Sequence, residues 1–179
     1  HIPIVANLKD VLSAINAQIT DEDIPDLDDW HNRISDWKKQ YPFTFKNSDD
    51  DSILAQYAIK ELCRKTKDRD TYITVGVGQH QMWTAQFMFL PTHNSCVSAG
   101  GLGVMGFETP AAIGAQVGRP GATVWCVAGD GGFQMTLQEL GTIAQEHLPI
   151  KIAIMNNGYL GMVRQWQELF YDHRYKAVS

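Results

Sequence analysis

Two short polar segments have residue types and spacing that suit a metal and phosphate site. Gly129-Asp-Gly-Gly132 and Asn156-Asn157 each follow a run of β-branched and apolar residues. Glycines at a strand end let the backbone approach a phosphate, and free N–H groups of a following helix attract anions. Asp130 and Asn157 supply hard oxygen ligands of the kind that Mg²⁺ prefers. Alone, either segment would be a turn or a helix cap. Together they predict a magnesium–diphosphate site.

A second glycine-rich segment could be mistaken for a dinucleotide site. Gly101-Leu-Gly-Val-Met-Gly106 matches the pattern GxGxxG. That fingerprint needs a firm strand before it and an acid about 20 residues after it. The residues before it, 91–95, are typical of a loop, and no acid occurs between Arg119 and Ala128. We therefore exclude nicotinamide binding here.

The elements around these segments alternate between strand and helix patterns. Strands are predicted at 72–75, 96–98, 123–127 and 150–155, and helices at 52–65, 81–89, 111–117, 133–146 and 160–169. The first helix has Ser52 as its cap and Ile53, Tyr57 and Leu62 facing inward, and Thr109-Pro110 opens the third. This alternation predicts an α/β fold with a doubly wound, mainly parallel sheet and helices on both faces. Ligands bind beyond the carboxyl ends of such strands, so turns 76–80, 129–132 and 156–161 should share one edge.

The first 51 residues do not continue this alternation. Residues 1–20 contain a strand-like run at 2–5 and an amphipathic helix, capped by Asn7 or Asp10, which together predict the tail of a preceding domain. Residues 21–51 hold ten acids against four bases and are predicted to be an acidic linker. Within the linker, Trp30, Ile34 and Trp37 predict one amphipathic helix, which Pro42 ends. Residues 52–179 are predicted to form the domain that carries the magnesium–diphosphate site, and we expect this domain to be truncated at its C-terminal end.

Composition narrows the class of protein. The chain is 44% hydrophobic and 20% charged, with a net charge of −5, which is typical of a globular domain and argues against nucleic-acid binding. No apolar run approaches the ~18 residues that a membrane span needs, and we expect no signal peptide, because residues 1–8 lack a basic region followed by a long apolar run. Cys63, Cys96 and Cys126 form no CxxC pair, so we expect reduced, mostly buried thiols and a cytoplasmic, bacterial-like location. An organelle stays open, because the sequence does not begin with Met.

The pair GDG and NN resembles the thiamine-diphosphate motif. Residues 76–83, 100–107, 110–115 and 161–167 are similar to co-linear segments of the large catalytic subunit of acetohydroxyacid synthase (acetolactate synthase), and the likeness covers nearly the whole chain. The resemblance implies the thiamine-diphosphate-binding fold. It also implies decarboxylation of pyruvate and condensation with pyruvate or 2-ketobutyrate, giving acetohydroxyacids for branched-chain amino acid biosynthesis. The implied cofactors are thiamine diphosphate and Mg²⁺, with FAD in the full-length protein.

The resemblance also assigns roles to residues of this chain. Magnesium would be held by Asp130, Asn157 and the carbonyl of Tyr159. The diphosphate would contact Gln79, His80, Gly131, Gly132, Gly158, Tyr159, Leu160, Gly161 and Met162. The aminopyrimidine would lie against Gly103, Val104 and Met105, and FAD would touch Gly100 and Gly101. Trp166 would line the substrate entrance and favour 2-ketobutyrate.

Several of these residues have plainer interpretations without the resemblance. His80 would then be a structural hydrogen-bonding residue, Met105 a loop methionine, and Trp166 a core tryptophan beside Met162. The chain also departs from the family at two places. Gly132 stands where serine is frequent, and Ser98-Ala-Gly-Gly101 replaces Ser-Gly-Gly, which weakens the FAD assignment more than the magnesium assignment.

The resemblance finally implies partners beyond this chain. The family's catalytic glutamate lies in an N-terminal domain and acts from the partner subunit, so we expect no catalytic residue here and no activity from these residues alone. The expected partners are 2-ketoacid substrates, a second copy that shares the active site, and a regulatory small subunit, with neither nucleic acid nor membrane. The alternatives are another thiamine-diphosphate carboligase or oxidase, such as glyoxylate carboligase or pyruvate oxidase, and a non-catalytic cofactor-binding module.

Overall fold

The computed structural model describes residues 1–20, 24–46, 52–88 and 95–179, and its chain divides into two compact units. The units are His1–Thr44 and Phe45–Ser179. Six of the linker's ten acids, the predicted end of the second helix at residue 89, and the loop before Ser95 lie outside the described residues. The second unit begins ahead of the predicted boundary at 52, and the ring of Phe45 packs edge-on against Phe87 at 5.4 Å.

The first unit contains two helices. In α1 (Leu8–Asn16), Asn7 is the N-cap, and its side-chain oxygen accepts a hydrogen bond from the Lys9 N–H at 3.0 Å, as one of the two predicted caps would. The strand expected at residues 2–5 is wrong, because within the described part of this unit no strand lies beside it to accept pairing. Leu8, Leu12 and Ile15 of α1 are exposed, and exposed apolar area of this kind is typical of an interaction surface.

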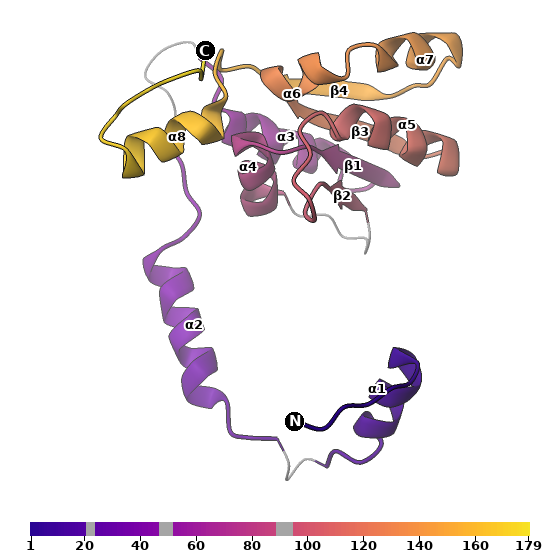
Figure 1. Ribbon diagram of the computed structural model, residues 1–179, viewed down its shortest axis with the longest axis vertical. Coiled ribbons are helices and arrows are strands. Elements are labelled where there is room, and N and C mark those ends of the chain that lie inside the picture. Colours follow the sequence, from indigo (N-terminus) through magenta and orange to yellow (C-terminus); the bar gives the residue numbers. More distant parts are fainter. Residues whose placement is uncertain (21–23, 47–51, 89–94) are drawn as a thin grey trace. The chain divides into compact units, whose positions relative to one another are not determined.

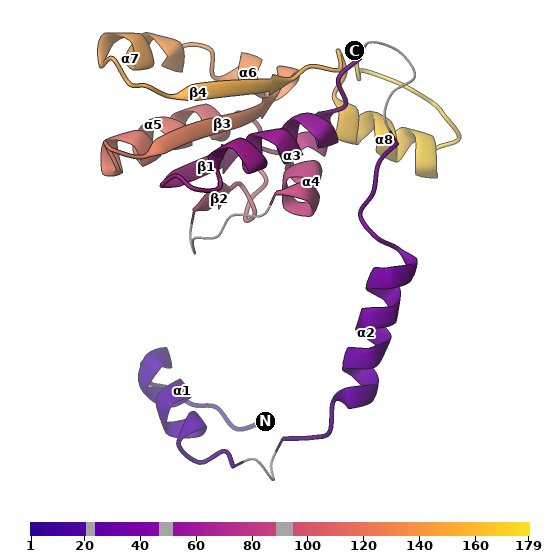
Figure 2. The same ribbon diagram turned by 180° about the vertical axis from the view of Figure 1, so that it is seen from behind.

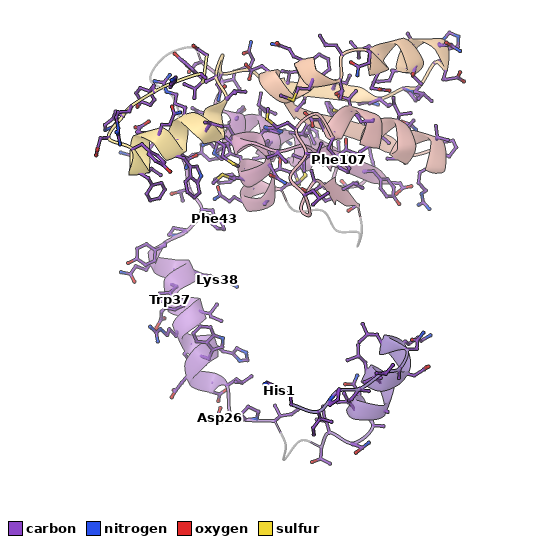
Figure 3. The ribbon with its side chains drawn as sticks, in the orientation of Figure 1. His1, Asp26, Trp37, Lys38, Phe43 and Phe107 are labelled. Atoms are coloured by element: carbon purple, nitrogen blue, oxygen red, sulfur yellow. The ribbon has the colours of Figure 1, made fainter. Side chains whose placement is uncertain are left out.

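Helix α2 (Asp28–Gln40) is the amphipathic helix predicted in the linker. The rings of Trp30 and Trp37 meet edge-on at 5.8 Å on one side of it, and Trp37 and Lys38 both project from this helix in Figure 3. The helix ends two residues before Pro42, as expected from the missing N–H and fixed φ of proline.

The second unit is built on one four-stranded parallel sheet. Its strands are β1 (Thr71–Val75), β2 (Cys96–Ser98), β3 (Thr123–Gly129) and β4 (Lys151–Met155), in the order β2-β1-β3-β4. This confirms the predicted α/β fold. The order reverses between β1 and β3, and such a switch point leaves a crevice beyond the strand ends.

Helices cover both faces of this sheet, as predicted. Helices α3 (Ala55–Thr66) and α4 (Gln79–Phe87) belong to one face, where Leu62 packs with Ile73, Val75 and Val127. Helices α5 (Glu108–Gly118) and α6 (Asp130–Met135) belong to the other, where Ala112 and Phe133 pack around β3. Figure 1 shows α5 in front of the sheet, and Figure 2, from behind, brings α3 to the front. Helices α7 (Glu139–Gln145) and α8 (Gly161–Phe170) complete the unit.

Two helix starts differ from the prediction. Helix α3 begins at Ala55 after an extended Leu54, so Ser52 does not cap it, and Ile53 and Tyr57 are 76% and 49% exposed rather than inward. Leu62 faces inward as predicted, together with Ile59, Cys63 and Thr66, and these four residues follow the helical period.

Helix α5 begins at Glu108, so Thr109 is inside its first turn and does not cap it. The Thr109 hydroxyl is fully buried beside the Cys126 sulfur at 3.9 Å, on the face of the sheet that α5 covers. Thr109 is therefore part of the buried core and is not the N-cap that its position in the sequence suggested.

The single helix predicted at 133–146 is two helices, α6 and α7. Thr136 ends α6 in a non-helical conformation, and its hydroxyl donates to the Gly106 carbonyl at 3.1 Å. That carbonyl belongs to a loop distant in sequence. The spacing of the apolar residues continues across this break, so it could not predict where the helix ends.

The burial of the three cysteines agrees with the prediction of mostly buried thiols. Cys63 and Cys126 are buried and Cys96 is exposed, and desolvation raises the pKa of the Cys126 thiol to about 11. Within the described ranges, no helix is long and apolar enough to cross a membrane.

The central position of β1 makes a prediction about stability. Ile73 is 0% exposed, and Ile73→Ala should lower the free energy of unfolding by about 2–5 kcal/mol through lost burial and a residual cavity. Ile154→Ala, on β4 at 43% exposure, is the control and should cost much less. Urea denaturation followed by circular dichroism measures both. Equal losses would mean that β1 does not lie in the core.

Candidate functional site

The carboxyl ends of β1, β3 and β4 open into one pocket of the second unit. The turn after β1, the start of α6 and the loop from β4 into α8 form its wall, so the predicted shared edge is confirmed. Among the predicted cofactor residues, those lining it are Gln79, His80, Met105, Asp130, Gly131, Gly132, Asn157, Tyr159, Leu160, Gly161 and Met162. Trp83 also lines the pocket and was not singled out from the sequence, although it stands within a segment similar to the family.

Oxygen ligands gather at the ends of two neighbouring strands. Gly129 pairs with Met155, so Asp130 and Asn157 follow the paired ends of β3 and β4. Three or more His, Cys, Asp or Glu side chains suited to a metal do not cluster anywhere in the described ranges, so Asp130 would act with neutral oxygens. One carboxylate, one amide and one carbonyl fit Mg²⁺, which commonly takes its remaining ligands from phosphate and water.

The backbone of the loop before α8 is partly occupied by its own hydrogen bonds. The N–H groups of Gly158 and Tyr159 donate to the side chains of Asn156 and Asn157, and the Leu160 N–H donates to the Val178 carbonyl at 2.7 Å. These three N–H groups are therefore not free for a diphosphate, which narrows the prediction for this turn. The N–H groups of Gly161 and Met162, at the start of α8, have no hydrogen-bond partner among the described residues.

The first turn of α6 offers a similar set of donors. Gly131 and Gly132 follow Asp130 in this turn, where N–H groups have no acceptor within the helix. A Cβ built on Gly131 would stand 2.8 Å from Cδ2 of Leu160 and 3.8 Å from Cε of Met105. The backbone at Gly131 therefore lies directly against the apolar side chains of the pocket wall. Because no side chain projects from it, an anion can approach its N–H groups closely.

His80 lies in the first turn of α4, beside this backbone. It is 5% exposed, and its Nε2 has no hydrogen-bond partner among the described residues, which contradicts a purely structural hydrogen-bonding role for that atom. Burial lowers the pKa of His80 to about 4, while the negative charge of Asp130 opposes this shift. The imidazole is therefore neutral near pH 7, with an unused ring nitrogen.

Glu108 is a buried acid behind two turns next to the pocket, and sequence reasoning missed it. It is 0% exposed, burial raises the pKa of its carboxyl, and the backbone N–H groups of Gly106 and Glu108 offset part of that shift. A Cβ built on Gly76 or Gly132 would collide with this carboxyl. Glu108 therefore packs directly against the turn after β1 and the first turn of α6. Its only sequence signal was an acid between Phe107 and Thr109-Pro110 at the start of a predicted helix.

The remaining predicted residues lie outside the pocket lining. Val104 is 54% exposed, and a Cβ built on Gly103 would only just reach the side chain of Val77, at 4.0 Å. Gly100 and Gly101 have open space beside them. Trp166 is 57% exposed on α8, where its ring meets Phe170 at 5.0 Å, so the core interpretation of this tryptophan is wrong.

Comparison with known proteins agrees with this geometry. Residues 76–179 match the family described as thiamine pyrophosphate enzyme, C-terminal TPP binding domain, and thiamine pyrophosphate is thiamine diphosphate. The chain is 45% identical over 181 aligned positions to the acetolactate synthase of Mycobacterium bovis, covering 99% of this chain and 29% of that protein. It is 42% identical to the large subunit of Corynebacterium glutamicum acetolactate synthase, over 100% of this chain and 29% of that protein.

A further relative is similar over a shorter part of the chain. The acetolactate synthase large subunit of Porphyra purpurea is 50% identical over 146 residues, covering 82% of this chain and 24% of that protein. The chain thus spans less than a third of the length of these relatives. The pocket built from β1, β3 and β4 lies within the matched residues 76–179, and the chain belongs to the thiamine pyrophosphate enzyme family through its C-terminal TPP binding domain.

Proposed function

We propose that this chain is the magnesium- and diphosphate-binding part of an acetolactate synthase large subunit. The whole protein would join two 2-ketoacids, pyruvate with pyruvate or 2-ketobutyrate, for branched-chain amino acid biosynthesis. The observation that carries this proposal is the meeting of Asp130 and Asn157 at adjacent strand ends, in a pocket with free helix N–H groups. The names of the relatives support the choice among thiamine-diphosphate enzymes.

Magnesium would be held by the Asp130 carboxylate, the Asn157 side-chain oxygen and the Tyr159 carbonyl. The Asn157 oxygen already accepts from the Tyr159 N–H at 3.0 Å, which fixes its direction and leaves a second lone pair for a metal. Charge on a diphosphate would be met by the metal and by backbone N–H groups, because no lysine or arginine of the described residues lines the pocket.

The diphosphate would receive hydrogen bonds from Gly131, Gly132, Gly161 and Met162, whose N–H groups are at the starts of α6 and α8. His80 lines the same pocket and would also contact the diphosphate. A neutral imidazole with one N–H can donate to a phosphate oxygen, and its other nitrogen sets which tautomer is present.

The rest of the cofactor would lie along the apolar wall that includes Trp83, Met105 and Met162. Thiamine diphosphate, when bound, supplies a thiazolium carbon that accepts the electrons released when a 2-ketoacid loses carbon dioxide. The chain's own contribution is to orient this group, exclude water around it and anchor its charged end. Gly103 and Val104, in the loop that carries Met105, would lie against the aminopyrimidine.

The wider protein would complete the site. Residues 1–20 would be the tail of a preceding domain and 21–51 a linker, consistent with the exposed apolar face of α1. A second copy would supply the catalytic glutamate, a regulatory small subunit would bind elsewhere, and FAD would touch Gly100 and Gly101. Trp166 would line the 2-ketoacid entrance. A cytoplasmic, bacterial-like location is part of the same proposal.

The metal assignment is tested at Asp130. Asp130→Ala or Asp130→Asn removes the carboxylate from the proposed ligand set and should weaken magnesium-dependent cofactor binding at least about tenfold. Isothermal calorimetry of the intact protein with thiamine diphosphate and Mg²⁺ measures this, and thermal unfolding checks the fold. Glu146→Ala, an exposed acid on the end of α7, is the charge-matched control. Wild-type affinity in both Asp130 variants would refute the assignment.

The substrate assignment is tested at Trp166 in the intact enzyme. Trp166→Leu should lower discrimination for 2-ketobutyrate over pyruvate by about 1–3 kcal/mol, because one apolar contact is lost. Competition assays that quantify 2-aceto-2-hydroxybutyrate and 2-acetolactate measure the ratio, and products of another kind would point to a sibling carboligase or oxidase. Phe170→Leu, on the neighbouring ring, is the control. A wild-type ratio in Trp166→Leu would remove this residue from the entrance.

Burial of His80 predicts a pH dependence of stability. Its pKa falls from 6.5 to about 4 on folding, so the unfolded chain binds more protons and stability drops as pH falls through this window, by about 3 kcal/mol in all. His80→Gln should remove this part of the slope, and His31→Gln, at an exposed site on α2, is the control. Denaturant titrations between pH 4 and 7 without cofactor measure both. Parallel curves for His80→Gln and wild type would contradict the burial of a neutral imidazole.

A further inference from the structure

Three side-chain amides connect the proposed metal site to the middle of α8. The Tyr159 N–H donates to Oδ1 of Asn157 at 3.0 Å, and Nδ2 of Asn157 donates to Oε1 of Gln79 at 3.2 Å. Nε2 of Gln79 then donates to Oε1 of Gln165 at 3.0 Å. The chain therefore links the loop after β4, the first turn of α4 and helix α8.

One backbone group sets the direction of all three amides. A backbone N–H can only donate, so Asn157 must turn its oxygen toward Tyr159 and its NH₂ toward Gln79. Gln79 must then present its oxygen to Asn157 and its NH₂ to Gln165. Gln165 consequently serves as an acceptor, and reversal of any one amide would place two donors or two acceptors together.

The network is packed against the start of α8. A Cβ built on Gly161 would overlap Oε1 of Gln79 and stand 2.7 Å from Nδ2 of Asn157. The hydrogen bond between these two amides therefore lies directly over the first residue of the helix. Gln165 stands one turn further along the same helix, and Trp166 follows it.

We propose that Gln165 is a positioning residue for the metal site, which rests on the proposed function. Through Gln79 it holds the Asn157 amide with its oxygen facing the metal. The same contact fixes α8, which carries Trp166, to the diphosphate end of the pocket. Partners that orient metal ligands typically change metal affinity by about 10–100-fold when they are removed.

Two substitutions at Gln165 separate accepting a hydrogen bond from filling space. Gln165→Glu keeps an acceptor for Gln79 in the same place, whereas Gln165→Met keeps the length and loses the acceptor. We expect Gln165→Met to raise the dissociation constant for Mg²⁺ about tenfold at saturating thiamine diphosphate, and Gln165→Glu to stay within about twofold of wild type. Calorimetric titration of the intact protein measures both, with Glu168→Gln on the same helix as the control.

A double-mutant cycle adds a second measurement. If Gln165 acts through Gln79, adding Gln165→Met to Gln79→Met should cause no further loss of Mg²⁺ affinity, because the contact is already gone. Additive losses, or equal losses in the Glu and Met variants, would overturn the proposal, as would wild-type affinity in Gln165→Met. Failure of the wild-type protein itself to bind Mg²⁺ with thiamine diphosphate would instead refute the proposed function.

Discussion

Parallel pairing of β3 with both of its neighbours sets the position of every group in the pocket. Val75 of β1 pairs with Val127, and Met155 of β4 pairs with Gly129, so the turns that follow emerge at one edge. Helix α4 then covers one face and α6 the other, and the space between them stays open. A one-residue slip in β3 would turn its inward side chains to the opposite face, and Asp130 would move with them.

The back of the pocket combines two buried ionisable groups with glycine backbone. His80 and Glu108 are each 5% exposed or less, and burial moves the pKa of each toward its neutral form, downward for the imidazole and upward for the carboxyl. Glycine at 76 and 132 lets the Glu108 carboxyl come directly against the backbone. Of the two, His80 lines the pocket itself, whereas Glu108 lies behind the turns that aim N–H groups at an anion.

The features that the sequence predicted correctly are those that depend on the pattern of neighbouring residues. The four strands of the sheet were predicted within about two residues of their ends, whereas a β-branched run at residues 2–5 is not a strand. The proximity of Asp130 and Asn157 could also be predicted, because the carboxyl ends of parallel strands lie at one edge of the sheet. Thr136 broke a predicted helix through a hydrogen bond to Gly106, and Glu108 was buried by contacts with two turns. Those outcomes depend on residues distant in sequence, which periodicity does not contain.

Helix α8 has two faces with different partners, and this explains why its sequence mixes amides with large apolar residues. Gln165 accepts a hydrogen bond from Gln79, which contacts the proposed metal-binding loop, while Trp166, Leu169 and Phe170 are more than half exposed. A helix held by polar contacts on one side leaves its apolar side free to contact something else. Exposed apolar area of this kind marks an interaction surface. Since one rigid helix carries both faces, any change that loosens its polar anchor also moves the apolar surface beside the pocket.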